Sequence, residues 1–226
     1  HYCSRRQRQM CIRDRSYAPK ETLSYFMYQN PRRAKKLFHD IIPKSSDEFL
    51  GHLNKFNTQS DQEQIENPVW HIMNGENSIG NVNVTYNLIL NLVAASGKND
   101  PAIILDFVKK YDENINSSNR QFINDLIKGA INFERDITSE KINFKTPSSE
   151  ERKIFEDLIN RLRSQAESAD AETIQTEIYQ IGKDHNFENL RDWFKLIYQV
   201  LFGKEDGPRF GTFIAIYGIK QTIELI

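Results

Sequence analysis

Apolar side chains recur at helical spacing along almost the whole chain, and no segment alternates apolar and polar residues as a half-buried strand does. The clearest case is 190–202, where Trp193, Ile197 and Leu201 fall on one face. Hydrophobic residues make up 38% of the chain and charged residues 27%, which suits a chain able to bury a core. The pattern therefore predicts an all-α fold.

The predicted helices fall into two groups, joined by the polar stretch 138–146. We expect a first helical sub-domain at 17–140 and a C-terminal one at 141–226. In the first, Ser45 and Glu48 match a capping box, which predicts that a helix opens at Ser45 and runs to Phe56. The fold class expected is thus all-α with two packed helical groups.

The first sixteen residues lack this pattern. HYCSRRQRQMCIRDRS contains five arginines, one aspartate and both cysteines of the chain. MCIRDR resembles translated sequencing-adapter DNA, so we interpret 1–16 as a disordered, non-native leader on a chain that has lost its upstream part. A basic RNA-binding arm is the alternative. The spacing of Cys3 and Cys11 fits no metal-ligand pattern, so we predict no metal site.

Without the leader the chain carries 25 Lys and Arg against 30 Asp and Glu, a net charge of −5. Such a chain can contact a polyanion only through local basic patches. One patch lies at the start of a helix predicted from Pro31, where cations oppose the helix dipole and so do not serve local stability. It is either a solvated face or a phosphate-contacting patch, made of Arg32, Arg33, Lys35 and Lys36.

The stretch 203–218, GKEDGPRFGTFIAIYG, is the second candidate. Its Gly207-Pro208 pair predicts a helix start with Arg209 and Phe210 in the first turn, Gly211 allowing close backbone approach and Gly218 ending the helix. Arg209 and Phe210 can form a charge-plus-stacking platform for a nucleobase. Phe213, Ile214 and Tyr217 read as core. Weaker candidates on the preceding helix are Trp193, whose type and position are more typical of a core residue, and Lys195.

We predict no catalytic residue. Walker, GxGxxG, GxSxG and HExxH motifs are missing from the sequence. No candidate nucleophile has a spacing from a histidine or carboxylate that predicts a base within hydrogen-bond distance. His71 reads as a structural or RNA-contacting residue; a hydrolase or transferase would need it in a cleft beside a carboxylate. No run approaches the ~20 apolar residues of a membrane span, so we expect no membrane partner and a cytoplasmic protein.

Four separated segments closely resemble class I lysyl-tRNA synthetases. They are YAPKETLSYFMYQNPRRAKKLFHDIIP, NLILNLVAASGKNDPAIILDFVKKY, IYQIGKDHNFENLRDWFKLIYQVL and GKEDGPRFGTFIAIYGIKQTIELI. Agreement in several ordered blocks, spread over 17–226, is far more specific than one short motif.

The resemblance implies a ligase that joins lysine to its tRNA through a lysyl-adenylate, using ATP with Mg. The family's Rossmann-type domain carries HIGH-like and KMSKS-like signatures, and neither occurs in this sequence. The resemblance therefore implies that this chain alone is inactive, holds no cofactor, and comprises a stem-contact region followed by an α-helical anticodon-binding domain.

The partner implied is a lysine-accepting tRNA, with lysine and ATP bound only by the intact enzyme. We assign Arg32, Arg33, Lys35 and Lys36 to the stem, on residue type and position. Arg209, Phe210, Trp193 and Lys195 are assigned to the anticodon on the same grounds. The alternative is a helical protein-interaction module that does not bind RNA.

Overall fold

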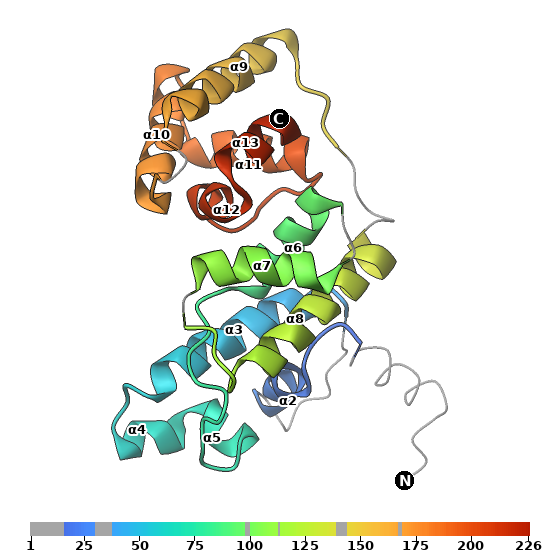
Figure 1. Cartoon of the computed structure of the whole chain (residues 1–226), viewed down its shortest axis with the longest axis vertical. Helices are drawn as coiled ribbons and strands as arrows, with labels where there is room; N and C mark the ends of the chain where they lie inside the picture. The colour runs from blue at the N-terminus through green and yellow to red at the C-terminus, as the bar shows by residue number, and fades with distance from the viewer. Residues whose placement is uncertain (1–15, 30–37, 98–99, 113, 139–143, 167–168) are drawn as a thin grey trace. The chain divides into compact units, whose positions relative to one another are not determined.

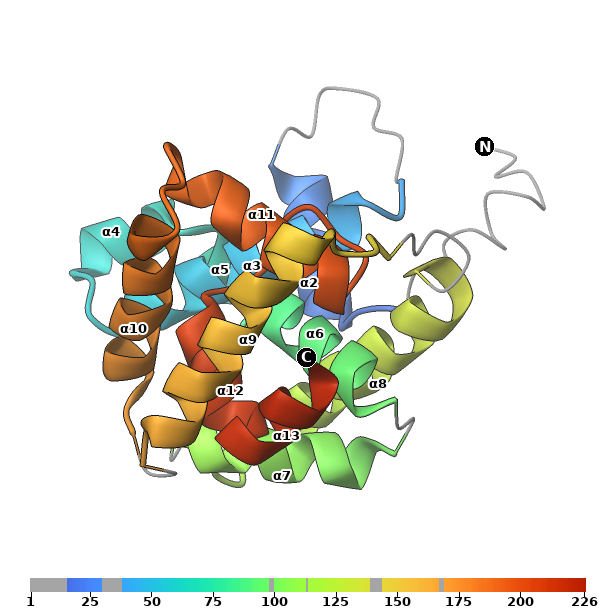
Figure 2. The same cartoon turned by 90° about the horizontal axis from the view of Figure 1, so that it is seen from above.

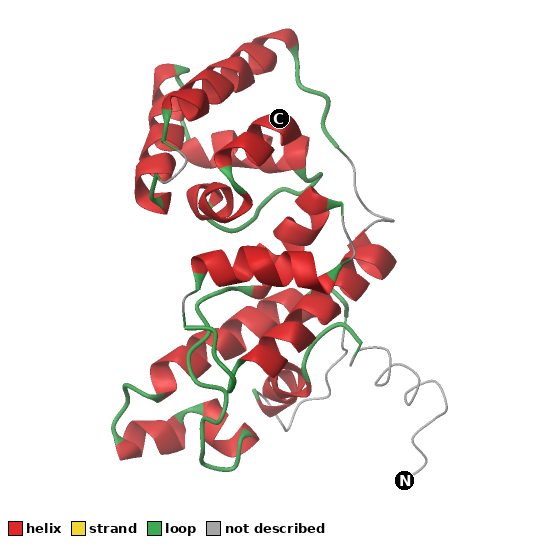
Figure 3. Ribbon diagram, viewed as in Figure 1, coloured by secondary structure: helices red, strands yellow, loops and turns green. Residues whose placement is uncertain are grey.

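Helices are the only regular secondary structure in the part of the chain that the structure describes. This computed structural model describes residues 16–29, 38–97, 100–112, 114–138, 144–166 and 169–226. Within those ranges helices are joined by turns and loops and no strand occurs (Figure 3), which confirms the all-α prediction. None of these helices is long and apolar enough to cross a membrane.

The chain forms two compact units. Unit 1 comprises His1–Val93 and Asn99–Thr138, and unit 2 comprises Ala94–Lys98 and Ser139–Ile226.

Unit 1 contains the helices drawn from blue to yellow-green in Figure 1. Its core lies between α3, α6, α7 and α8, and the Phe49 and Phe122 rings of α3 and α8 meet at 6.2 Å. The elements are α2 (Lys20–Tyr28), α3 (Ile41–Phe56), α4 (Asp61–Glu66), α5 (Pro68–Ile72), most of α6 (Tyr86–Ser96), α7 (Pro101–Tyr111), α8 (Arg120–Phe133) and the π-helical turn η1 (Glu134–Thr138).

Helix α3 begins at Ile41, so the predicted capping box at Ser45 is wrong. Ser45 lies inside the helix, is buried, and donates its hydroxyl to the Thr22 carbonyl of α2 at 3.1 Å. The serine thus connects two helices, because a hydroxyl in a helix interior is free to bond a neighbouring chain segment.

The segment between α5 and α6 is extended and is held by polar side chains. Asn54 of α3 both donates to the Val82 carbonyl and accepts from the Val82 N–H, each at 2.8 Å. Asp112 accepts the N–H of Asn83 at 2.9 Å. A segment outside any helix needs such partners for its backbone groups, and the hydrophobic periodicity did not reveal them.

Asp47 of α3 holds the first residues of α6. Its carboxylate accepts the Tyr86 N–H at 2.5 Å and the Asn87 side-chain amide at 2.6 Å. Burial raises the pKa of Asp47, and these hydrogen bonds counteract only part of that rise. A carboxylate at a helix N-terminus satisfies backbone donors that have no partner in the helix.

Unit 2 is a bundle of five helices in the described ranges, in which α10 packs against α9, α11 and α12, and α13 packs against α9 and α12. The two views in Figures 1 and 2 show α9 running beside α10. The elements are α9 (Ser149–Ser164), α10 (Ala171–Asp184), α11 (Leu190–Leu201), α12 (Phe210–Tyr217) and α13 (Ile219–Leu225).

Three of the five helices begin with side-chain caps. Ser148 and Glu151 form a capping box at α9, and Asp170 and Asn189 accept backbone N–H groups at α10 and α11. Helix α12 begins at Phe210 with Arg209 as its N-cap. The predicted start at Pro208 was therefore two residues early, whereas the end at Gly218, whose φ is 106°, is confirmed.

We expect Asn54→Ala to lower the free energy of unfolding by about 1–3 kcal/mol, because it leaves two backbone groups of Val82 without partners. Lys55→Ala, at the exposed position next to Asn54 on the same helix, should change it by less than about 0.5 kcal/mol. Urea denaturation of both variants checks this. Equal effects would show that Asn54 does not hold the segment.

Candidate nucleic-acid interface

The predicted site residues fall into three groups in the structure. Arg32, Arg33, Lys35 and Lys36 lie outside the described residues. Trp193 and Phe210 belong to the core of unit 2, with no exposed surface. Lys195 and Arg209 line a pocket in unit 2.

Trp193 and Phe210 pack as core residues. The Trp193 indole N–H donates to the Ile178 carbonyl at 2.9 Å, and the Phe187 ring lies 5.5 Å away. Phe210 stacks on Phe213, with ring centroids 5.7 Å apart. The sequence-based assignment of both rings to a base-stacking surface is wrong, because neither ring presents a face that a base could cover.

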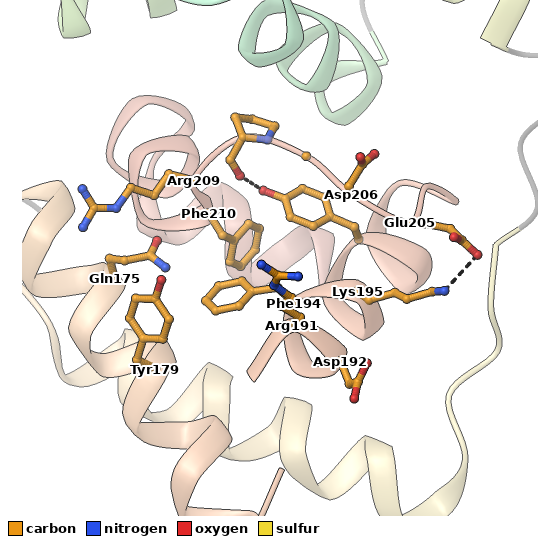
Figure 4. Close-up of a pocket in the computed structure, with 13 residues that line it drawn as sticks. Gln175, Tyr179, Arg191, Asp192, Phe194, Lys195, Glu205, Asp206, Arg209 and Phe210 are labelled. Carbon is orange, nitrogen blue, oxygen red and sulfur yellow. Dashed lines mark hydrogen bonds and ion pairs between the residues drawn. The ribbon is translucent and has the colours of Figure 1, made fainter. Parts of the chain in front are cut away.

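The pocket has a volume of about 380 Å³ and is formed by α10, α11, the loop after α11 and the start of α12 (Figure 4). A volume in this range suits a small ligand or part of a larger one. Thirteen residues line it: Gln175, Tyr179, Arg191, Asp192, Phe194, Lys195, Tyr198, Glu205, Asp206, Gly207, Pro208, Arg209 and Phe210.

The inner wall depends on a close approach of α10 and α12 at Gly211. A Cβ added there would lie 2.5 Å from the Ala171 carbonyl oxygen and 2.8 Å from the Gln175 backbone nitrogen. The Gly211 N–H donates to Gln175 Oε1 at 2.7 Å, and Gln175 is only 2% exposed. The sequence-based expectation that Gly211 allows close backbone approach is confirmed.

Tyr198 holds the loop that closes one side of the pocket. Its hydroxyl donates to the Pro208 carbonyl, and its own carbonyl accepts the Lys204 N–H at 3.2 Å. A Cβ on Gly207 would collide with the Tyr198 ring. Burial, and to a smaller extent the Asp206 charge, raises the pKa of Tyr198, so the hydroxyl stays protonated as a donor.

The charges around the pocket are balanced. Arg209 forms two hydrogen bonds with the Glu172 carboxylate at 2.6 and 2.7 Å, and these bonds together with the Arg209 charge lower the pKa of Glu172. Lys195 pairs with Glu205 at 3.0 Å. Arg191 is exposed and has no ion-pair partner within the ranges the structure describes. A phosphate would have to compete with carboxylates for Arg209 and Lys195.

Two aromatic residues that the sequence did not single out as site candidates have accessible rings here. Tyr179 of α10 is 40% exposed, and its ring meets Phe194 of α11 edge-on with centroids 5.1 Å apart. In Figure 4 both rings point into the space between α10 and α11, with Arg191 beside Phe194. From the sequence, only the place of these two residues on amphipathic helices could have indicated them as site residues. The i, i+4 spacing from Gln175 to Tyr179 is no such indication, because it occurs on every face of a helix.

His71 does not form a catalytic pair with a carboxylate in the described structure. Its Nε2 lies 2.9 Å from the Ile65 carbonyl oxygen, and its ring stacks on Tyr28 at 5.2 Å. Within the described ranges no group of His, Cys, Asp and Glu side chains could hold a metal ion.

We expect Gly211→Ala to destabilise unit 2 by at least about 1–3 kcal/mol, because the added methyl group meets backbone atoms that cannot rotate away. Gly51→Ala, the same change in the middle of α3, has no atom within 4 Å of the new Cβ and should stabilise the protein by about 0.4–1 kcal/mol. Thermal unfolding measures both. A neutral Gly211→Ala would mean that α10 and α12 are not in close contact.

Comparison with known proteins finds similarity to lysine–tRNA ligases. Residues 10–76 match the family described as tRNA synthetases class I (K). The chain is 39% identical over 212 residues to the lysine–tRNA ligase of Rickettsia bellii (strain OSU 85-389), a match that covers 93% of this chain and 41% of the relative. The corresponding enzyme of Rickettsia felis is also 39% identical, over 93% of this chain and 40% of its own length.

The lysine–tRNA ligase of Rickettsia rickettsii (strain Sheila Smith) is 37% identical over the same share of this chain and 41% of its own. The chain thus spans about two fifths of the length of the curated relatives it matches. Over nearly all of its residues, the chain is thus similar to about two fifths of a lysine–tRNA ligase, and its first third matches the class I tRNA synthetase (K) family.

Proposed function

We propose that this chain is the tRNA-binding part of a class I lysine–tRNA ligase. The observation that carries the proposal is the 39% identity over 93% of the chain. In this proposal residues 17–140 contact the tRNA stem and residues 141–226 form the anticodon-binding bundle. The intact enzyme would work in the cytoplasm, where tRNAs are charged.

The part played by this chain is to position the tRNA. Bases of an anticodon loop are unstacked, so aromatic and arginine side chains can stack on them and polar groups can read their edges. The unit 2 pocket offers Tyr179, Phe194 and Arg191 for stacking, with Arg209 and Lys195 at its rim. The buried Phe210 and Trp193 support this surface from within.

The cluster Arg32, Arg33, Lys35 and Lys36 is proposed to contact phosphates of the stem. Such contacts fix the register of an RNA and carry no sequence information. Lysine, ATP and Mg would be bound by the intact enzyme, and the ligation of lysine would take place there. We therefore propose that this chain alone binds tRNA but does not charge it.

The alternative, a helical protein-interaction module, is favoured by one observation. Met27 and Phe38 in unit 1 are 62% and 60% exposed, the highest values among the large apolar side chains of the described residues. A module of this kind would not discriminate among tRNAs.

The purified chain should bind lysine tRNA more tightly than other tRNAs, with an affinity that falls as salt rises. It should transfer no lysine to tRNA in the presence of ATP and Mg. Filter binding and aminoacylation assays measure the two properties. If the chain alone attached lysine to tRNA, its assignment as a non-catalytic part would be wrong. If it bound all tRNAs equally, its binding would be explained by electrostatic attraction alone, without anticodon recognition.

Alanine at Arg32, Arg33, Lys35 and Lys36 together should weaken binding of every tRNA by a similar factor. It should also reduce the slope of log affinity against log salt by up to about 0.7–0.9 for each phosphate that no longer meets a cation. The control replaces Lys109 and Lys110, two exposed cations of α7. An unchanged salt slope in the quadruple variant would place the stem contacts elsewhere.

A further inference from the structure

We propose that Glu172 is a specificity-determining residue that keeps RNA phosphates away from Arg209, so that RNA is held at the unit 2 pocket through its bases. This role rests on the proposed function, since it assigns the selection against phosphates to one carboxylate of the anticodon-binding bundle.

Two helix N-termini and one guanidinium group meet at the rim of the pocket. Ala171 is the first residue of α10, and a Cβ added to Gly211, the second residue of α12, would lie 2.5 Å from the Ala171 carbonyl oxygen. Arg209 is the N-cap residue of α12. Helix N-termini carry partial positive charge and attract anions. The Arg209 corner, formed by Ala171, Arg209 and Gly211, therefore favours a negatively charged group.

The Glu172 carboxylate supplies this negative charge. Arg209 Nη1 donates to Glu172 Oε1 at 2.6 Å, and Arg209 Nη2 donates to Oε2 at 2.7 Å. In Figure 4 the Arg209 side chain points away from the Phe194 ring. The hydrogen bonds from Arg209, and then its charge, lower the pKa of Glu172, so the carboxylate is ionised at neutral pH.

A phosphate would need the same two N–H groups. The planar guanidinium group binds carboxylate and phosphate oxygens in the same two-bond geometry. The Glu172 and Arg209 side chains are 74% and 48% exposed, so an RNA can reach the pair. A phosphate that binds Arg209 must displace the carboxylate and then lie beside its negative charge. Uncharged bases do not meet this repulsion.

Asp170 is the other carboxylate that acts on Glu172, but it has a different role. It accepts the Thr173 N–H at 2.8 Å and the Thr173 hydroxyl at 2.9 Å, and thereby caps α10. Its charge raises the pKa of Glu172, an effect smaller than the lowering by Arg209. Glu172 is thus the carboxylate that competes with a phosphate for Arg209.

The test measures binding of the full chain to an RNA hairpin with abasic nucleotides in its loop, which offers phosphates and no bases there. Glu172→Gln should bind this hairpin about threefold more tightly than the wild-type chain, the size of one exposed charge contact. The slope of log affinity against log salt should become steeper by about 0.7, as for one more phosphate contact with a single strand.

The same variant should discriminate less between tRNAs. Lysine tRNA is already held by base contacts in the proposed function, so an added phosphate contact should strengthen its binding less than that of a tRNA with another anticodon. The ratio of the two affinities should therefore fall by about twofold to threefold, a range that follows from the gain expected for the abasic loop.

Glu150→Gln is the matched control. Glu150 is the second residue of α9, as Glu172 is of α10, and it is exposed and forms no ion pair within the described ranges. The control removes the same charge from the same helix position and should change binding of the abasic loop by less than about 1.5-fold. Combined with Arg209→Gln, Glu172→Gln should also have little effect, because no guanidinium group is released.

Three results would overturn this role of Glu172. They are equal effects of Glu172→Gln and Glu150→Gln on the abasic loop, a gain that persists with Arg209→Gln, and an unchanged preference of Glu172→Gln for lysine tRNA. A different pattern would separate this role from the proposed function. If the wild-type chain binds all tRNAs alike while Glu172→Gln gains affinity for the abasic loop through Arg209, the anticodon assignment is wrong and Glu172 still excludes phosphates.

Discussion

The approach of α10 to α12 at Gly211 is the constraint on which the site in unit 2 depends. Backbone atoms of Ala171 and Gln175 lie where a Cβ at position 211 would be, so only glycine allows this spacing. The same approach brings the Gly211 N–H to Gln175 and fixes the orientation of its amide. One missing side chain therefore determines both the packing of two helices and the polarity of the pocket wall.

The aromatic residues of unit 2 separate into two sets with different roles. Trp193, Phe202, Phe210 and Phe213 are buried and fill the space between helices, whereas Tyr179 and the half-buried Phe194 keep accessible edges and faces at the pocket. Ion pairs of Arg209 with Glu172 and of Lys195 with Glu205 leave the pocket electrostatically balanced. Base contacts thus suit this surface better than phosphate contacts, which agrees with the proposed anticodon-binding role in a chain of net negative charge.

Much of the fold follows from the sequence pattern, and the errors have identifiable causes. Helical periodicity located α11, and Gly218 marked the end of α12. Ser45 was misread as a cap, because its hydroxyl bonds the Thr22 carbonyl of another helix, a partner far away in sequence. The extended segment near Val82 was missed for the same reason: its hydrogen bonds come from Asn54, 28 residues earlier.

The helical character of the chain and its family resemblance could be read from the amino-acid order, because periodicity and local motifs are properties of neighbouring residues. The burial of individual aromatic residues could not, since Phe210 and Phe194 have the same chemistry and comparable positions near a helix start. In the folded chain both rings border the pocket, but Phe210 is fully buried whereas Phe194 is half-buried and keeps accessible surface there. Burial depends on which helices meet, and that follows from contacts between distant residues such as Gly211 and Gln175.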